Sequence, residues 1–306
     1  MRIIGAGMAG LLAANMLRRH KPIIYEKRPS LPSNHAAVLR FRTEGVSRAT
    51  GIPFKKVRVN KAICAPDGEM ITTPNLRYSN MYALKTLGRV LDRSILNLDV
   101  VDRWIAPADF INHMASSVDI RFGQEFWPNT EYCKEPIIST IPMPHLMNLL
   151  GWEKKPEFSS KSIWVITGTI IDPEVDVYQT IYYPETANPV YRASITGNQL
   201  IVEMVFTPDS TPEEILPMVA WDFGLGYPKF SDCSCSRQFF GKIGPIDQIA
   251  RKQFIFAASE RYHIYSLGRF ATWRQILLDD LVQDVQFIEG FIAQRDLYSA
   301  AKTTIK

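Results

Sequence analysis

Apolar and polar residues at the start of the chain follow a strand–helix–strand pattern. A short apolar run at 2–5 precedes the stretch 8–20, in which apolar residues recur at intervals of three and four. This spacing is typical of a helix with one buried face. A second apolar run, 22–26, ends on an acidic residue and predicts another buried strand. The beginning of the chain is therefore expected to form a βαβ unit.

The middle of the chain follows a different rhythm. Between 161 and 206, short apolar runs are separated by turn signals and no helical spacing interrupts them. This region predicts a mostly antiparallel sheet, different in kind from the first unit. Strands are predicted near 2–5, 22–26, 38–42, 54–63, 119–126, 136–141, 161–171, 177–183, 190–196, 199–206, 235–241 and 263–268, and helices near 8–20, 76–91, 107–117, 143–150, 212–223, 248–259 and 273–294.

Composition narrows the class of protein without naming its chemistry. The 306 residues are 46% hydrophobic and 22% charged, which is ordinary for a globular chain. A net charge of +4 is compatible with an anionic cofactor or substrate but is weak support for nucleic-acid binding. The four cysteines lack metal-site spacing, so no metal site is predicted. No apolar run approaches the roughly 20 residues that span a bilayer, and a cytoplasmic protein without a membrane partner is expected.

The turn after the first predicted strand carries the pattern G-x-G-x-x-G. Gly5 permits a tight turn, Gly7 removes the side chain where a pyrophosphate must approach the backbone, and Gly10 lets the helix pack against the sheet. The helix that follows offers free N–H groups and a positive partial charge to phosphates. Because strand, motif and helix occur in register, we predict a dinucleotide site here.

The second predicted strand ends on Glu26, roughly 20 residues after Gly5. A carboxylate at this place accepts hydrogen bonds from the ribose of a bound dinucleotide. A glycine-rich turn in an unrelated α/β domain would not explain why the acid ends the next strand. Met8 and Ala9 within the loop, and Lys27 beside the acid, complete the predicted cofactor contacts.

The far end of the chain repeats the order of strand, glycine and helix. The run 263–268 predicts a buried strand that breaks at Gly268, and helical spacing follows from Trp273. The segment Gly268–Arg274 resembles the C-terminal flavin motif of glutathione-reductase-type flavoproteins, in the amine-oxidase and UDP-galactopyranose-mutase branch. The resemblance implies that both chain ends meet on one FAD, with Gly268 and Arg269 at its pyrophosphate or flavin end and Trp273 nearby.

The chain also resembles short phage and prophage flavoproteins, some of which are associated with enzymes that build modified thymines. The glycine pair usual after the ribose acid is replaced by Asn34-His35-Ala36-Ala37, and the middle of the chain matches poorly. The expected fold is α/β, with a Rossmann-like FAD-binding domain built from both chain ends and an inserted, mostly antiparallel β-sheet substrate domain. The predicted division assigns 1–75, 107–150 and 240–306 to the FAD-binding domain, and 76–106 and 151–239 to the substrate domain.

Outside the glycine motifs, the candidate site residues are single side chains. The resemblance places His35 where the chain passes toward the flavin, and Lys85 on the helix at 76–91 could reach a substrate or a water at the flavin. Ordinary loop and strand packing explains all such residues at least as well. The other candidates are Arg40 and Arg42 for the pyrophosphate, and Tyr183 and Arg192 for an anionic or aromatic substrate.

The sequence contains no evident Ser-His-Asp set, metal cluster or carboxylate pair, so a bound flavin would carry the chemistry. One dinucleotide motif and no second site for NAD(P)H favour an oxidase whose flavin is reoxidised by molecular oxygen. The resemblance implies oxidation of a C–N bond in an amine or amino acid. A phage-type substrate would be an amino acid attached to thymine in DNA, in the host cytoplasm. Two alternatives stay open: a non-redox mutase acting on a sugar nucleotide, and an NAD-binding protein without a flavin.

Overall fold

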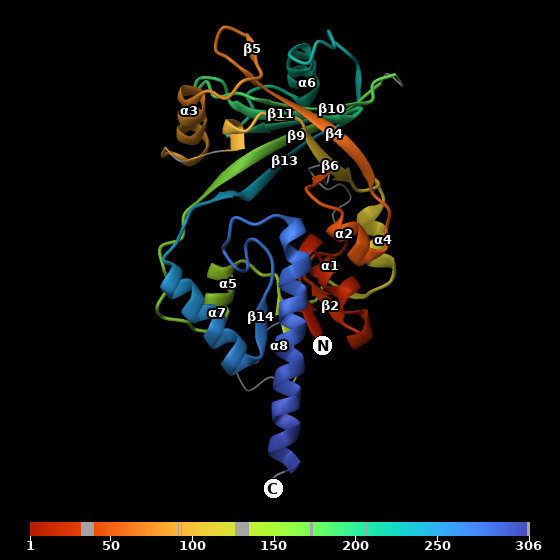
Figure 1. Ribbon diagram of the computed structural model, residues 1–306, viewed down its shortest axis with the longest axis vertical. Coiled ribbons are helices and arrows are strands. Elements are labelled where there is room, and N and C mark those ends of the chain that lie inside the picture. Colours follow the sequence, from red (N-terminus) through yellow and green to blue (C-terminus); the bar gives the residue numbers. More distant parts are fainter. Residues whose placement is uncertain are drawn as a thin grey trace.

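The chain is built around two β-sheets, one above the other in Figure 1. The structure is a computed structural model that describes residues 1–31, 40–90, 92, 94–125, 135–171, 174–205 and 207–304. The smaller sheet lies among the helices at both chain ends, and the larger sheet lies beyond it. No helix in these described ranges is long and apolar enough to cross a membrane.

The smaller sheet has five parallel strands in the order β14-β8-β1-β2-β7. The first strand of the chain is therefore central, and the last strand lies at one edge. A sheet of this kind must be covered on both faces, and its inner strands β8 and β1 and the edge strand β14 are mostly apolar, whereas the edge strand β7 is largely exposed. Its members are β1 (Arg2–Ile4), β2 (Ile23–Glu26), β7 (Asp119–Phe122), β8 (Ile137–Ser139) and β14 (Ile264–Ser266).

Helices cover both faces of this sheet. Ile3 and Ile138 pack toward α1 and α8, whereas Ile4 and Ile137 pack toward α5 and α7, as the alternation of strand side chains requires. A short 3-10 helix, η1 (Arg18–His20), follows α1. The first face carries α1 (Met8–Met16), α2 (Gly45–Thr50), α4 (Phe110–Ser116) and α8 (Leu278–Thr304), and the second carries α5 (Met143–Leu149) and α7 (Gln248–Tyr262).

The larger sheet has nine strands, with the order β13-β9-β12-β11-β10-β4-β6-β3 and β5 paired to β4. All its pairs are antiparallel except β10 with β4. Its strands are β3 (Arg40–Phe41), β4 (Lys55–Cys64), β5 (Met70–Ile71), β6 (Val101–Ile105), β9 (Ser160–Ile170), β10 (Val177–Tyr182), β11 (Val190–Gly197), β12 (Gln199–Met204) and β13 (Phe230–Ile243).

Two helices pack on the larger sheet. Helix α6 (Pro212–Trp221) lies on the face turned away from the smaller sheet (Figure 1), and its first turn is fixed by reciprocal hydrogen bonds of Thr211 and Glu214. Helix α3 (Leu76–Leu87) lies at one end of the sheet, next to the 3-10 helix η2 (Ser94–Leu96). The predicted fold class is confirmed: a parallel sheet from both chain ends carries an inserted, mostly antiparallel sheet.

Several local predictions differ from the structure. The last helix begins at Leu278 rather than near 273, because Trp273 has a left-handed backbone with φ of 47°. Strands β3, β4 and β5 lie within the segment 1–75 that the prediction assigned to the FAD-binding domain, yet they pair within the larger sheet. The sequence pattern also gave no sign of α2 or of the strand β6, which are short and flanked by loops.

Candidate functional site

The loop from Gly5 to Gly10 has a backbone that excludes side chains at two of its three glycines. Gly5 has φ of 96°, and a Cβ there would lie 2.4 Å from Thr140 Oγ1. A Cβ on Gly10 would lie 2.0 Å from the carbonyl oxygen of Gly5. Helix α1 can therefore approach the strand this closely only with glycine at position 10. Gly7 differs, because a Cβ there would meet nothing within 4 Å. The fold requires the outer glycines, and the middle one borders empty space.

That empty space is a cavity of about 500 Å³ at the carboxyl ends of β1, β2 and β8. Gly5 and Gly7 form one wall, Glu26 and Lys27 another, and Pro142 at the start of α5 a third. Gly7 is also the N-cap of α1 and provides no side chain to bond the first-turn N–H groups. A helix terminus open at the carboxyl edge of a parallel sheet is suited to binding a phosphate or pyrophosphate.

Glu26 closes this loop from the neighbouring strand. Its buried carboxylate accepts a 2.7 Å hydrogen bond from the Ala6 N–H, which ties the loop to the end of β2. Arg28 donates to the same carboxylate from its backbone N–H at 3.0 Å and its Nε at 2.9 Å. Burial raises the pKa of Glu26, but the hydrogen bonds from Arg28 and Ala6 outweigh it and leave this pKa below its usual value. The group is a fixed anion in the cavity wall.

Arg28 is a site residue that the sequence interpretation missed. Side chains two positions apart on an extended strand share one side, so a basic residue two places after the acid was a usable signal. Its side chain is partly exposed, at 45%. A ribose hydroxyl could therefore displace the Arg28 side chain from Glu26, because the displaced guanidinium would remain in contact with solvent.

Glu26→Gln is expected to weaken FAD binding by about 1.5–3 kcal/mol, the range for a hydrogen bond to a charged group. Glutamine keeps the shape but removes the negative charge that would accept the ribose hydroxyls of the expected FAD. Glu125→Gln is the matched control, because Glu125 lines the same cavity from an exposed position. Titration of apoprotein with FAD measures both, and equal weakening by the two variants would contradict the role of Glu26.

The two glycine loops predicted to meet on one cofactor do lie together. Gly268 follows β14 with φ of 99°, and a Cβ there would lie 3.1 Å from the Ala9 Cβ in the first loop. Met8 and Ala9 are half-buried at this junction. The Arg269 guanidinium turns instead toward the Gly241 carbonyl at 3.3 Å and Gln275 at 3.2 Å. The C-terminal loop thus supports the first loop through its backbone.

Trp273 is a packing residue in this structure. Its ring lies edge-on to Phe158 and Phe240, with ring centroids 4.8 Å and 5.8 Å away, and Nε1 donates to the Gly244 carbonyl. It does not line the cavity beside Gly7. Its left-handed backbone ends the turn at 269–273, and α8 begins only at Leu278.

Arg40 and Arg42, both predicted at the pyrophosphate, point to different places. Arg40 donates from Nη1 to Thr180 Oγ1 at 3.1 Å, on the larger sheet. Burial, with repulsion from Arg192, lowers the pKa of Arg40 to about 10. Arg42 forms a 2.7 Å ion pair with Asp280 in the first turn of α8. Neither side chain lines the cavity beside Gly7.

Arg192 lies on the same sheet face as Thr180, opposite the face on which α6 packs. It forms an ion pair with Glu203, whose other oxygen accepts a 2.7 Å hydrogen bond from Tyr191. Burial opposes charge on both groups, but their mutual attraction raises the pKa of Arg192 and lowers that of Glu203. Arg40, Thr180, Arg192 and Glu203 thus form a polar cluster on this face.

Tyr183 and Lys85 do not belong to this polar cluster, because each is held by hydrogen bonds elsewhere. Tyr183 is buried under α6, and its hydroxyl donates to Asp222 at 2.8 Å. Lys85 Nζ donates to the carbonyls of Tyr183 at 2.8 Å, Glu185 at 2.7 Å and Val190 at 2.5 Å. Burial lowers the pKa of Lys85 to about 7, against the opposing effect of Glu185. His35 lies outside the described residues.

Comparison with known proteins identifies the fold. No protein-family model and no curated protein sequence matches the chain. Among solved structures, reduced UDP-galactopyranose mutase superposes with a TM-score of 0.64 at 16% identity, covering 96% of this chain and 93% of that one. An oxidoreductase from Methanosarcina mazei gives 0.58 at 10% identity, covering 94% and 99%. A geranylgeranyl bacteriochlorophyll reductase-like protein from Thermoplasma acidophilum gives 0.52 at 13%, covering 96% and 79%.

These likenesses extend over nearly the whole chain, inserted sheet included. At such identities they establish a common fold. The predicted arrangement of a Rossmann-like unit and an inserted sheet is therefore shared with enzymes of redox and mutase type. The chemistry of this chain must be argued from its own site.

Proposed function

We propose that the chain binds FAD in the cavity beside Gly7. The observation that carries this proposal is the excluded Cβ at Gly5 and Gly10 next to an open Gly7, with the Glu26 carboxylate on the facing wall. The helix terminus would hold the pyrophosphate and Glu26 the ribose. The contact of the Gly268 loop with Ala9 favours FAD over NAD, because the resembling flavoproteins join both chain ends at one flavin.

We propose further that the protein is an FAD-dependent oxidoreductase, an oxidase acting on a C–N bond of an amine or amino acid. Bound FAD would supply the redox chemistry: the substrate would lose a hydride from the carbon beside nitrogen and a proton from the nitrogen to become an imine, and molecular oxygen would take up the two electrons and two protons as hydrogen peroxide. The chain would contribute binding and orientation. Arg40 and Arg192, which lie on the sheet face opposite α6, would hold a carboxylate or phosphate of the substrate.

A thymine-linked amino acid in phage DNA is the most specific form of this proposal, and it rests on the resemblance alone. The alternative is a non-redox flavoenzyme that isomerises a nucleotide sugar. The extensive structural likeness to UDP-galactopyranose mutase supports that alternative. The same two arginines would then hold a diphosphate. The two chemistries differ in whether substrate itself reduces the flavin.

Anaerobic mixing with candidate substrates distinguishes them. Amines, amino acids and aminoacyl-thymine DNA are each added to oxidised, FAD-loaded protein while the flavin band near 450 nm is followed. We expect one of them to bleach the band at a rate more than about tenfold above that in buffer. Air should then restore the band, with one hydrogen peroxide formed per turnover. Arg192→Gln should slow bleaching, with FAD content as its control.

Two results would overturn the oxidase proposal. One is absence of bleaching by every candidate together with isomerisation of a nucleotide sugar by dithionite-reduced protein. The other is a colourless purified protein that takes up NAD and no FAD. The second result would also remove the FAD assignment, whereas the first would leave it intact.

A further inference from the structure

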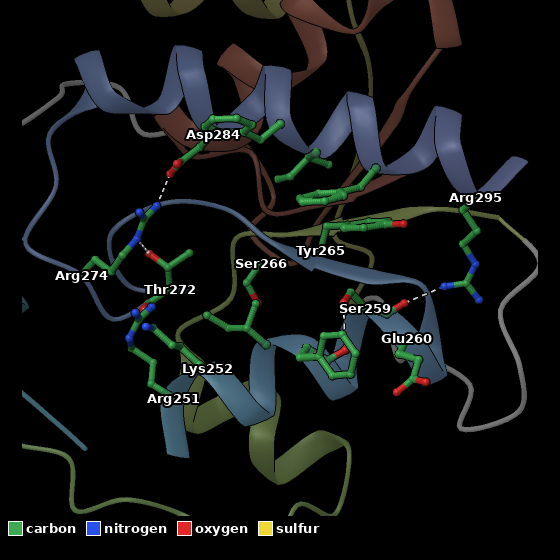
Figure 2. Close-up of a pocket in the computed structure, with 15 residues that line it drawn as sticks. Arg251, Lys252, Ser259, Glu260, Tyr265, Ser266, Thr272, Arg274, Asp284 and Arg295 are labelled. Atoms are coloured by element: carbon green, nitrogen blue, oxygen red, sulfur yellow. Dashed lines mark hydrogen bonds and ion pairs between the residues drawn. The ribbon is translucent and has the colours of Figure 1, made fainter. Parts of the chain in front are cut away.

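A second hollow lies on the first unit, away from the dinucleotide cavity. It measures about 600 Å³ and lies between α7 and α8, with Tyr265 and Ser266 of the edge strand β14 between the two helices (Figure 2). None of its lining residues lines the cavity beside Gly7. Because α7 and α8 pack on opposite faces of the sheet, the edge of β14 lies in the gap between them.

The walls of this hollow are apolar and open to solvent. Phe256 on α7 is 66% exposed, and Phe287 and Phe291 on α8 are 57% and 58% exposed. Three large aromatic side chains exposed around one concave surface are unusual for a folded chain, where such groups are usually buried or scattered. The hollow can therefore contact a flat apolar ligand from α7 on one side and from α8 on the other.

The polar groups of the hollow gather at its ends. Arg251 and Lys252 lie at one end, and Arg274 beside them is paired with Asp284 (Figure 2). At the other end, Arg295 donates to the Ser259 carbonyl and so joins α8 to α7. The lining contains four basic residues and two acidic ones, which leaves an excess of positive charge.

Among the described residues, one buried cation in the hollow has neutral acceptors in place of an anionic partner, and one buried hydroxyl has no hydrogen-bond partner. Arg251 is 8% exposed, and the acceptors that the structure shows for it, the Thr272 carbonyl at 3.2 Å and Gln248 Oε1 at 2.9 Å, are both neutral. Burial and repulsion from Arg274 lower the pKa of Arg251. The buried Ser266 hydroxyl has no hydrogen-bond partner within the described part of the chain. Buried groups of this kind ordinarily find a partner.

We propose that this hollow binds a small organic anion with a flat apolar body. Its carboxylate, sulfonate or phosphate would lie between Arg251 and Lys252, and its body between Phe256, Phe287 and Phe291. The volume lies within the range of small-molecule sites, and a charged group at one end of an apolar wall fixes the orientation of such ligands. The excess of positive charge selects an anion over a neutral or cationic ligand of the same shape. This site is independent of the proposed function.

The probe is 2-naphthoate, with the neutral 2-naphthamide as its comparison, titrated calorimetrically into FAD-loaded protein. We expect one 2-naphthoate per chain, bound at least tenfold more tightly than the amide. Phe291→Ser and Phe287→Ser should each weaken 2-naphthoate at least tenfold. Phe239→Ser, which alters a comparably exposed phenylalanine outside the hollow, should leave it unchanged. Lys252→Gln changes an exposed side chain and should reduce the preference for anion over amide.

Three results would overturn this proposal. The first is that wild-type protein does not bind 2-naphthoate at about 1 mM, the weakest affinity that we expect for a ligand of this size. The second is binding that the Phe287 and Phe291 variants leave intact. The third is concentration-dependent dimerisation that Phe291→Ser abolishes, since a second copy would then cover the hollow. A variant that loses FAD should still bind 2-naphthoate, which separates this site from the flavin site.

Discussion

Gly7→Val is expected to abolish FAD retention while leaving the fold intact. The backbone at Gly7 is extended, with φ of −75° and ψ of 176°, a conformation that a β-branched residue adopts without strain. A Cβ there meets nothing within 4 Å beyond its chain neighbours, and the side chain would enter the cavity in which we place the pyrophosphate. The flavin absorbance that remains after gel filtration, relative to protein, measures the loss.

Two further substitutions make this result specific. Gly290→Val, on the exposed surface of α8, should retain FAD fully, because a Cβ there also meets nothing within 4 Å. Gly10→Ala should destabilise the protein itself, because its Cβ would lie 2.0 Å from the Gly5 carbonyl oxygen. Added FAD should raise the Tm of Gly290→Val but not of Gly7→Val. Full FAD occupancy in Gly7→Val would mean that the loop serves only the fold.

Lys85→Met is expected to destabilise the protein by about 3 kcal/mol or more. Methionine keeps the apolar stem but leaves three carbonyl oxygens without their donor, and each unsatisfied buried group costs about 1–3 kcal/mol. Arg77→Ala, at an exposed position of the same helix, is the control and should change stability by less than about 0.5 kcal/mol. Urea unfolding measures both, and a stable Lys85→Met protein would refute the structural role.

The same lysine should make stability depend on pH. Its pKa is about 7 in the folded protein, whereas an unfolded lysine titrates near 10.4. Between these values the unfolded chain binds more protons, so the free energy of unfolding should rise with pH from about 7 to about 10. The rise should be present in wild-type protein and absent from Lys85→Met. A common slope in the two proteins would assign it to other groups.

The sequence predicts the dinucleotide loop well because every part of that signal is local. Strand, glycines, helix and Glu26 follow one another within a single βαβ unit, and helical and strand periodicity place them in register. The residue that the structure adds to this wall, Arg28, also lies on that unit. Its hydrogen bonds with Glu26 depend on side-chain geometry at the strand end, which periodicity alone does not describe.

The candidates on the inserted sheet could not be sorted from the sequence. Tyr183 and Arg192 both belong to a strand-rich region, but the register of β10 and β11 turns them to opposite faces. Lys85 finds its acceptors on residues far along the chain, where no local pattern points to them. The parallel pairing of β10 with β4 likewise joins distant segments, and it draws β4 out of the first unit. Tertiary contacts decide each of these.

The central position of β1 bears on how the chain matures during synthesis. Its neighbour β2 emerges from the ribosome soon after it, but β8 follows only after the first strands of the inserted sheet, and β14 after the whole of it. Helix α8, whose Leu281 and Val285 pack in the same core as Leu12 of α1, is made after all of these strands. The nascent N-terminal segment must therefore keep an apolar helix face uncovered through most of translation, when aggregation and chaperone capture compete with folding.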